Sequence, residues 1–85
     1  MKSFEFEVQD AAGMHARPAG LLVKKAKEYE SKVTIHFGDK SADSGRMMAI
    51  MSLGVKQGDT IRVDVEGPDE DKAADEMEAF FKENL

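Results

Sequence analysis

Single apolar and polar residues alternate along three stretches of the chain, a pattern typical of β-strands that bury one face. These stretches lie at residues 4–8, 33–37 and 61–66. A fourth, short strand is predicted at residues 40–43, because it follows a tight glycine-aspartate turn at 38–39. The alternating strands are therefore expected to present an apolar face to a core.

Three further segments are predicted as helices. Over residues 16–29 apolar side chains recur at helical spacing, and Pro18 falls in the first turn, where its missing N–H is no loss. Residues 46–53 are predicted as a short helix that Ser44 caps and that ends at Gly54. A third helix closes the sequence, and its apolar face comprises Ala73, Ala74, Met77, Phe80 and Phe81.

The predicted order of elements is therefore βαββαβα. A chain of 85 residues is one small domain, residues 1–85. Strands that precede, separate and follow the helices predict an α+β fold, with the helices packed on one face of an antiparallel sheet.

The composition excludes several classes of protein. The chain has no cysteine, so disulfides, cysteine-based zinc sites and thiol nucleophiles are ruled out. No apolar run approaches the length that spans a bilayer, and residues 1–7 carry acids where a signal peptide needs an apolar stretch. We therefore expect a cytoplasmic protein without membrane insertion. The net charge of −5 argues against a nucleic-acid-binding protein.

The negative charge is concentrated towards the end of the sequence. Residues 65–85 contain eight acidic residues and two lysines, so the rest of the chain is nearly balanced. A local excess of positive charge is carried by Arg17, Lys24, Lys25 and Lys27. An acidic partner is therefore expected to bind at this helix.

His15 is the strongest candidate for chemistry. It lies between a turn at Gly13 and the helix at 16–29, with Arg17 two residues further on. A helix N-terminus exposes free N–H groups and the positive end of the dipole, so it receives anions well. That setting favours a neutral, nucleophilic imidazole, and an arginine can clamp phosphoryl oxygens. The grouping suits phosphoryl acceptance, although a histidine at a helix start is more often a cap or a surface residue.

Other chemistry finds little support in the sequence. His36 falls on the polar side of the strand at 33–37 and is expected to be a solvated histidine. The chain has no glycine-rich phosphate loop and no HExxH motif, and its histidines and carboxylates lack metal-ligand spacing. We therefore expect neither a metal nor a cofactor.

Methionines on the short helix allow two interpretations. Met47, Met48 and Met51 accompany Ile50 there, and a two-turn helix cannot bury all of these side chains. Methionine fills gaps in a core, and where it is exposed it favours adaptable protein–protein contacts. Both a core role and a docking patch are open at these positions.

Two stretches of the sequence resemble a known family. Gly13–Ala19 reads GMHARPA and Met51–Gly58 reads MSLGVKQG, with further matches at Lys40-Ser41 and Glu66-Gly67. With the chain length and the place of the histidine, they are similar to HPr proteins. These are histidine-containing phosphocarriers of the bacterial phosphoenolpyruvate-dependent sugar phosphotransferase system. The resemblance implies an open-faced β-sandwich, a four-stranded antiparallel sheet with three helices on one face.

The resemblance also implies a role for each matching residue. His15 would take a phosphoryl group on Nδ1 from phosphorylated enzyme I and pass it to enzyme IIA domains of sugar permeases. Arg17 would neutralise charge on the moving group, and the N–H groups of Ala16 and Arg17 would hydrogen-bond it. The chain would be a monomeric carrier rather than an enzyme. The docking surface would comprise Gly20, Leu21, Met47, Met48 and Met51, with Lys24 and Lys27 at its basic rim.

The chain departs from the family at two positions. Arg46, in the predicted first turn of the short helix, stands where members from low-GC Gram-positive bacteria carry a serine that an ATP-dependent kinase phosphorylates. That switch is expected to be missing. Ala12 replaces a small hydroxyl or polar residue of many members, which removes one side-chain contact to phosphate.

Two other functions stay open. One is a regulatory module that docks on a partner and transfers nothing, and the presence of both His15 and Arg17 argues against it. The other is a carrier in a parallel regulatory phosphotransfer chain, which the sequence does not separate from a sugar-system carrier.

Overall fold

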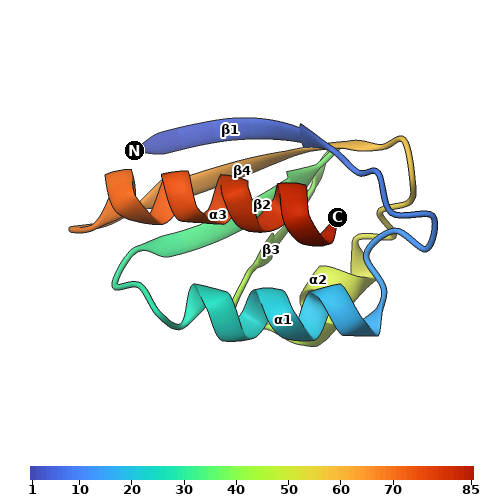
Figure 1. The fold of residues 1–85 in the computed structure, drawn as a ribbon, viewed down its shortest axis with the longest axis horizontal. Coiled ribbons are helices and arrows are strands. Elements are labelled where there is room, and N and C mark those ends of the chain that lie inside the picture. The colour runs from blue at the N-terminus through green and yellow to red at the C-terminus, as the bar shows by residue number, and fades with distance from the viewer.

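The computed structural model describes residues 1–85 and has the predicted order of elements (Figure 1). The strands are β1 (Lys2–Glu7), β2 (Lys32–Phe37), β3 (Lys40–Asp43) and β4 (Thr60–Glu66). The helices are α1 (Ala16–Ala26), α2 (Met47–Ser52) and α3 (Glu70–Asn84). The predicted βαββαβα order and the α+β class are confirmed.

The strands form one antiparallel sheet in the order β1-β4-β2-β3. Val63 of β4 pairs with Phe4 on one side and with Ile35 on the other. Ile35 pairs in turn with Ala42 of β3. Directly opposed residues point to the same face of a sheet, so this register assembles apolar side chains from all four strands on one face. Figure 1 shows the three helices gathered on one side of the sheet.

The helices bury the apolar face of the sheet and leave the other face to solvent. Phe81 of α3 is fully buried, and its ring centroid lies 5.8 Å from that of Phe4 and 5.7 Å from that of Phe6. Leu22 of α1 and Ile50 of α2 are fully buried in the same cluster. A sheet covered on one face only is the expected open-faced sandwich.

Polar side chains interact across the uncovered face of the sheet. Asp64 on β4 accepts a 2.6 Å hydrogen bond from the Ser3 hydroxyl and forms a 3.2 Å ion pair with Arg62. The hydrogen bond from Ser3 holds the pKa of Asp64 below its ordinary value, and the charge of Arg62 adds to the effect. His36 lies on this polar face as predicted. Its Nε2 is 2.9 Å from Asp64 Oδ2, so the imidazole is partnered rather than simply solvated.

Helix α1 ends at Ala26, three residues earlier than predicted. The N–H groups of Glu28 and Tyr29 bond to carbonyl oxygens three residues back, at Lys25 and Ala26, so the chain tightens into a turn. The Tyr29 hydroxyl donates a 2.5 Å hydrogen bond to Glu76 on α3. The end of α1 thus contacts a helix that is distant in the sequence, and helical spacing alone does not reveal such a contact.

The prediction that Ser44 caps the short helix is wrong. The N-cap of α2 is Arg46, and no side chain caps this helix. The N–H of Ser44 bonds to the carbonyl oxygen of Val33 on β2, which keeps this residue against the sheet. Ser44 is therefore fully buried, and its hydroxyl has no hydrogen-bond partner. Arg46 correspondingly precedes the first helical turn instead of lying in it.

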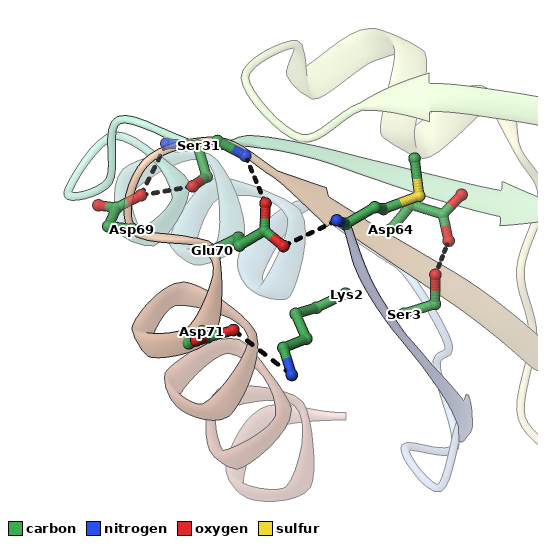
Figure 2. Close-up of polar contacts among 9 residues, drawn as sticks. Lys2, Ser3, Ser31, Asp64, Asp69, Glu70 and Asp71 are labelled. Carbon is green, nitrogen blue, oxygen red and sulfur yellow. Dashed lines mark hydrogen bonds and ion pairs between the residues drawn. The ribbon is translucent and has the colours of Figure 1, made fainter.

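The turn between β4 and α3 packs against the start of β2 (Figure 2). The carboxylate of Asp69 accepts hydrogen bonds from the N–H groups of Glu30 and Ser31, at 3.0 and 2.9 Å, and from the Ser31 hydroxyl at 2.5 Å. A Cβ at Gly67 would lie 2.5 Å from the Cα of Ser31, so only glycine fits this approach. The hydrogen bonds, led by that of the Ser31 hydroxyl, lower the pKa of Asp69.

Asp69→Asn is expected to lower the melting temperature at neutral pH and to lose that effect in acid. A carboxylate whose pKa is lowered by folding stabilises the folded state above its unfolded pKa, and this contribution fades as the pH falls through the folded pKa. The difference in melting temperature between the native chain and Asp69→Asn should be largest at about pH 7 and should disappear below about pH 4. Thermal melting followed by circular dichroism at both pH values measures it.

Asp71→Asn is the matched control for this experiment. Asp71 forms only an exposed 3.4 Å pair with Lys2, which contributes little to stability. Its substitution should leave the melting temperature unchanged at both pH values. A gap for Asp69→Asn that is equally large in acid and at neutral pH would contradict the prediction.

Candidate functional site

His15 stands at the junction between a loop and α1. It is the N-cap residue, with an extended backbone (φ −95°, ψ −175°), and its side chain makes no capping hydrogen bond. The side chain is 39% exposed. His15 therefore occupies the N-cap position without a side-chain capping bond, and its imidazole is accessible at the surface.

The loop before His15 is held against the segment that follows α2. Gly13 has a φ of +65°, and a Cβ there would lie 2.4 Å from the carbonyl oxygen of Val55. The Met14 N–H donates to the same oxygen at 3.1 Å. Glycine is needed at position 13 both for its backbone conformation and for this close approach. These contacts fix the backbone of the loop that leads into His15.

The fold of this loop places Asp10 beside His15. Its N–H donates to the carbonyl oxygen of Leu85 at 2.7 Å, and its Oδ1 accepts the Ala12 N–H at 2.8 Å. The same Oδ1 lies 3.8 Å from Nε2 of His15. Figure 1 shows this loop beside the C-terminal end of α3. Asp10 was not among the site residues predicted from the sequence, although an aspartate followed by two alanines and a glycine is a signal for such a side-chain turn.

The first turn of α1 offers hydrogen-bond donors to an anion. The first helical hydrogen bond runs from the Ala19 N–H to the His15 carbonyl oxygen. The N–H groups of Ala16 and Arg17 precede it and have no acceptor in the protein, and Pro18 has no N–H. Arg17 is exposed and forms no ion pair. The His15 imidazole, two free N–H groups and the unpaired Arg17 therefore all belong to the start of α1.

Apolar side chains are exposed on α1 and α2, which pack against each other. Leu21 is 38% exposed, and Met47 and Met48 are 37% and 75% exposed. Met51 is half-buried and packs against the core. Nothing lies within 4 Å of a Cβ built at Gly20, so the surface is open there. The methionines of the short helix thus contribute to the core and to the surface at once.

Positive side chains lie on α1, at its C-cap and at the N-cap of α2. Lys24, Lys27 and Arg46 are exposed and form no ion pair. Lys25 differs, because its Nζ lies 3.7 Å from Glu76 on α3. Besides Arg17 at its start, the free positive charge of α1 is therefore carried by Lys24 and by Lys27 at its C-cap, whereas Lys25 is engaged within the protein.

No hollow of the surface encloses the site. The hollows are lined by neither His15 nor Arg17. No three His, Cys, Asp or Glu side chains are placed to hold a metal ion. None of the helices has the length and apolar character to cross a membrane. His15 lies on open surface, which suits contact with another protein better than a small substrate held in a cleft.

Known proteins match this chain over nearly its whole length. A family model, "PTS HPr component phosphorylation site", matches residues 2–83. The phosphocarrier protein HPr of Lysinibacillus sphaericus is 37% identical over 83 residues, which is 98% of this chain and 94% of that protein. The chain belongs to the HPr family. The crystal structure of HPr from Bacillus anthracis has a TM-score of 0.87 at 29% identity, over 94% of this chain and 95% of that one.

Membership of the HPr family confirms the fold that the sequence motifs implied, an open-faced sandwich with a four-stranded antiparallel sheet. As a member of this family, the chain is a phosphocarrier of the phosphotransferase system rather than an enzyme. An HPr dimer from Thermoanaerobacter tengcongensis is similar as well, with a TM-score of 0.68 at 36% identity over 95% of this chain and 98% of that one. The monomeric state of this HPr-family chain therefore stays a prediction.

Proposed function

We propose that the chain accepts a phosphoryl group on Nδ1 of His15 from phosphorylated enzyme I and passes it to enzyme IIA domains of sugar permeases. The observation that carries the proposal is the exposed imidazole beside the free N–H groups of Ala16 and Arg17. Each transfer breaks the bond from phosphorus to the donor as a bond to the acceptor forms. The carrier needs only to place its nitrogen and to stabilise the phosphoryl oxygens.

The first turn of α1 provides that stabilisation. Phosphoryl oxygens are negative, and the helix start combines free N–H donors with the positive end of the dipole. Arg17 adds a delocalised cation whose planar donors match phosphoryl oxygens. Ala12 offers no side-chain hydrogen bond, so in this chain the backbone donors and Arg17 hold the group.

The exposed residues of α1 and α2 form the proposed docking surface. Leu21, Met47 and Met48 make its apolar centre, and Lys24 and Lys27 make its basic rim. A carrier must release each partner quickly, which favours a small apolar centre with a charged rim over a large obligate interface. We expect a monomer to be the working form, because one surface has to meet two partners in turn.

Incubation with phosphoenolpyruvate and enzyme I, followed by mass measurement, tests the proposal. We expect one acid-labile phosphoryl group per chain, and we expect an added enzyme IIA domain to remove it. A chain that stays unmodified would be a docking module without transfer. A phosphorylated chain that no sugar-specific enzyme IIA discharges would be a carrier in another phosphotransfer chain.

Met48→Glu is expected to raise the KM for enzyme I about tenfold, which corresponds to about 1.4 kcal/mol of binding free energy. Met48 is 75% exposed, so the substitution alters the docking surface and leaves the core intact. The rate of phosphorylation at several carrier concentrations measures KM. The melting temperature should stay near that of the native chain.

Ser41→Glu is the control for added negative charge. Ser41 is exposed on β3 and pairs with His36, which places it on the uncovered face of the sheet. Its substitution should leave KM unchanged. Equal KM values for the two variants would show that Met48 does not contact enzyme I.

A further inference from the structure

We propose that Asp10 is a positioning residue for His15. Its carboxylate attracts Nε2 of the imidazole and keeps the proton on that nitrogen, which leaves the lone pair of Nδ1 free to attack phosphorus. The proposal deepens the proposed function and rests on it. It assigns to Asp10 a role in transfer that acts through the imidazole of His15.

The loop itself fixes the place of the Asp10 carboxylate. The Asp10 N–H donates to Leu85 at 2.7 Å, and the Asp10 carbonyl oxygen accepts the Gly13 N–H at 2.9 Å. Oδ1 accepts the Ala12 N–H at 2.8 Å. The first two hydrogen bonds hold the backbone of Asp10 and the third holds its carboxylate, and none of them involves His15. Oδ1 then lies 3.8 Å from Nε2 of His15, and no other carboxylate forms an ion pair with this ring.

A carboxylate beside one ring nitrogen selects between the two tautomers of a neutral imidazole. The proton resides on the nitrogen that faces the acceptor, and the other nitrogen keeps its lone pair. At 3.8 Å the contact is longer than a hydrogen bond, so the attraction is electrostatic. Because Asp10 attracts Nε2, the nucleophile is Nδ1. An incoming phosphoryl group meets this lone pair and not the negative charge of the carboxylate.

The same carboxylate suits the phosphorylated state. Nδ1 supplies the electron pair of the new nitrogen–phosphorus bond, and the donor keeps the electron pair of the bond that breaks. The proton remains on Nε2 throughout, so the ring becomes a phosphoimidazolium with one positive charge. The negative charge of Asp10 offsets this charge, since opposite charges close together favour the charged form. No proton has to leave the ring during the transfer.

Asp10→Asn distinguishes the effect of the Asp10 charge on His15 from the structural role of Asp10 in the turn. Asparagine keeps the size of the side chain and an oxygen for the Ala12 N–H, but it removes the charge beside His15. Asp43→Asn is the matched control, because Asp43 Oδ1 accepts the Gly45 N–H two residues further on, at 2.7 Å, in the same kind of turn. Both variants should melt like the native chain.

Two measurements test the proposal. Nitrogen-15 NMR of the His15 ring in alkaline solution reports the tautomer of the neutral imidazole. Single-turnover phosphorylation by enzyme I reports the rate of transfer. The native chain and Asp43→Asn should carry the proton on Nε2, whereas Asp10→Asn should show a mixture of tautomers. Phosphoryl transfer to Asp10→Asn should be about tenfold slower than to the native chain. Loss of the partner that fixes the tautomer of a metal-bound histidine lowers affinity or activity about 10–100-fold, and the expected effect is at the lower end of that range.

An unchanged tautomer and an unchanged transfer rate in Asp10→Asn would overturn the inference. Slower transfer with an unchanged tautomer would also overturn it, since Asp10 would then act in some other way. The tautomer is measured without enzyme I, so its result does not depend on the proposed function. A native chain that takes no phosphoryl group would overturn the proposed function, even where the tautomer depends on Asp10.

Discussion

His15→Ala is expected to abolish acid-labile phosphorylation by phosphoenolpyruvate and enzyme I. Alanine has no nitrogen to accept the group, and the N–H donors and guanidinium beside it have no free lone pair to replace the imidazole. The His15 side chain is 39% exposed and makes no capping bond, so the free energy of unfolding should change by no more than about 0.5 kcal/mol. Mass measurement and urea unfolding report the two quantities.

His36→Ala is the matched control for the loss of a histidine. His36 contacts Asp64 on the uncovered face of the sheet and lies on another element than His15. The variant should be phosphorylated like the native chain. Retention of the label by His15→Ala, or its loss from His36→Ala, would show that the phosphoryl acceptor has been assigned to the wrong residue.

Gly13→Ala is expected to destabilise the fold by about 2–5 kcal/mol and to reduce phosphorylation strongly. A side chain at φ +65° costs about 1–2 kcal/mol, and forcing a methyl group into a packed site costs about 1–3 kcal/mol more. The new Cβ would lie 2.4 Å from the carbonyl oxygen of Val55, so the loop has to move and His15 moves with it. Urea unfolding measures the loss of stability, and enzyme I-dependent labelling measures the loss of function.

Gly38→Ala separates the two causes of that effect. Gly38 has nearly the same φ, +62°, but nothing lies within 4 Å of a Cβ built there. Its substitution should therefore lower the free energy of unfolding only by the cost of a side chain at positive φ, about 1–2 kcal/mol. Phosphorylation should be unchanged. Equal losses of stability for the two variants would mean that the contact between Gly13 and Val55 contributes nothing.

Most of the fold was predictable because its elements depend on periodicity. The alternating stretches at 4–8, 33–37 and 61–66 lie within two residues of the observed strands, since a strand with one buried face has to alternate. The start of α1 at Ala16 was also predicted, from Pro18 and the spacing of apolar residues. Each of these patterns depends only on residues that are close in the sequence.

Predictions failed where a distant segment competes for a local group. Ser44 has the side chain of a helix cap, but its N–H is bonded to Val33 and the residue is buried there. The end of α1 was predicted three residues too late, and Tyr29 in that stretch bonds to Glu76 on another helix. Neither partner is visible from the sequence around the residue.

The class of fold, the order of its elements, and the place of His15 and Arg17 at a helix start could all be predicted from the sequence. Each of these follows from residues that are neighbours along the chain. Two features became visible only in the folded chain: Met48 stays exposed while Met51 packs against the core, and the Asp10 carboxylate lies beside His15. Both features depend on contacts between segments far apart in the sequence, as when Leu85 and Val55 anchor the loop that carries Asp10.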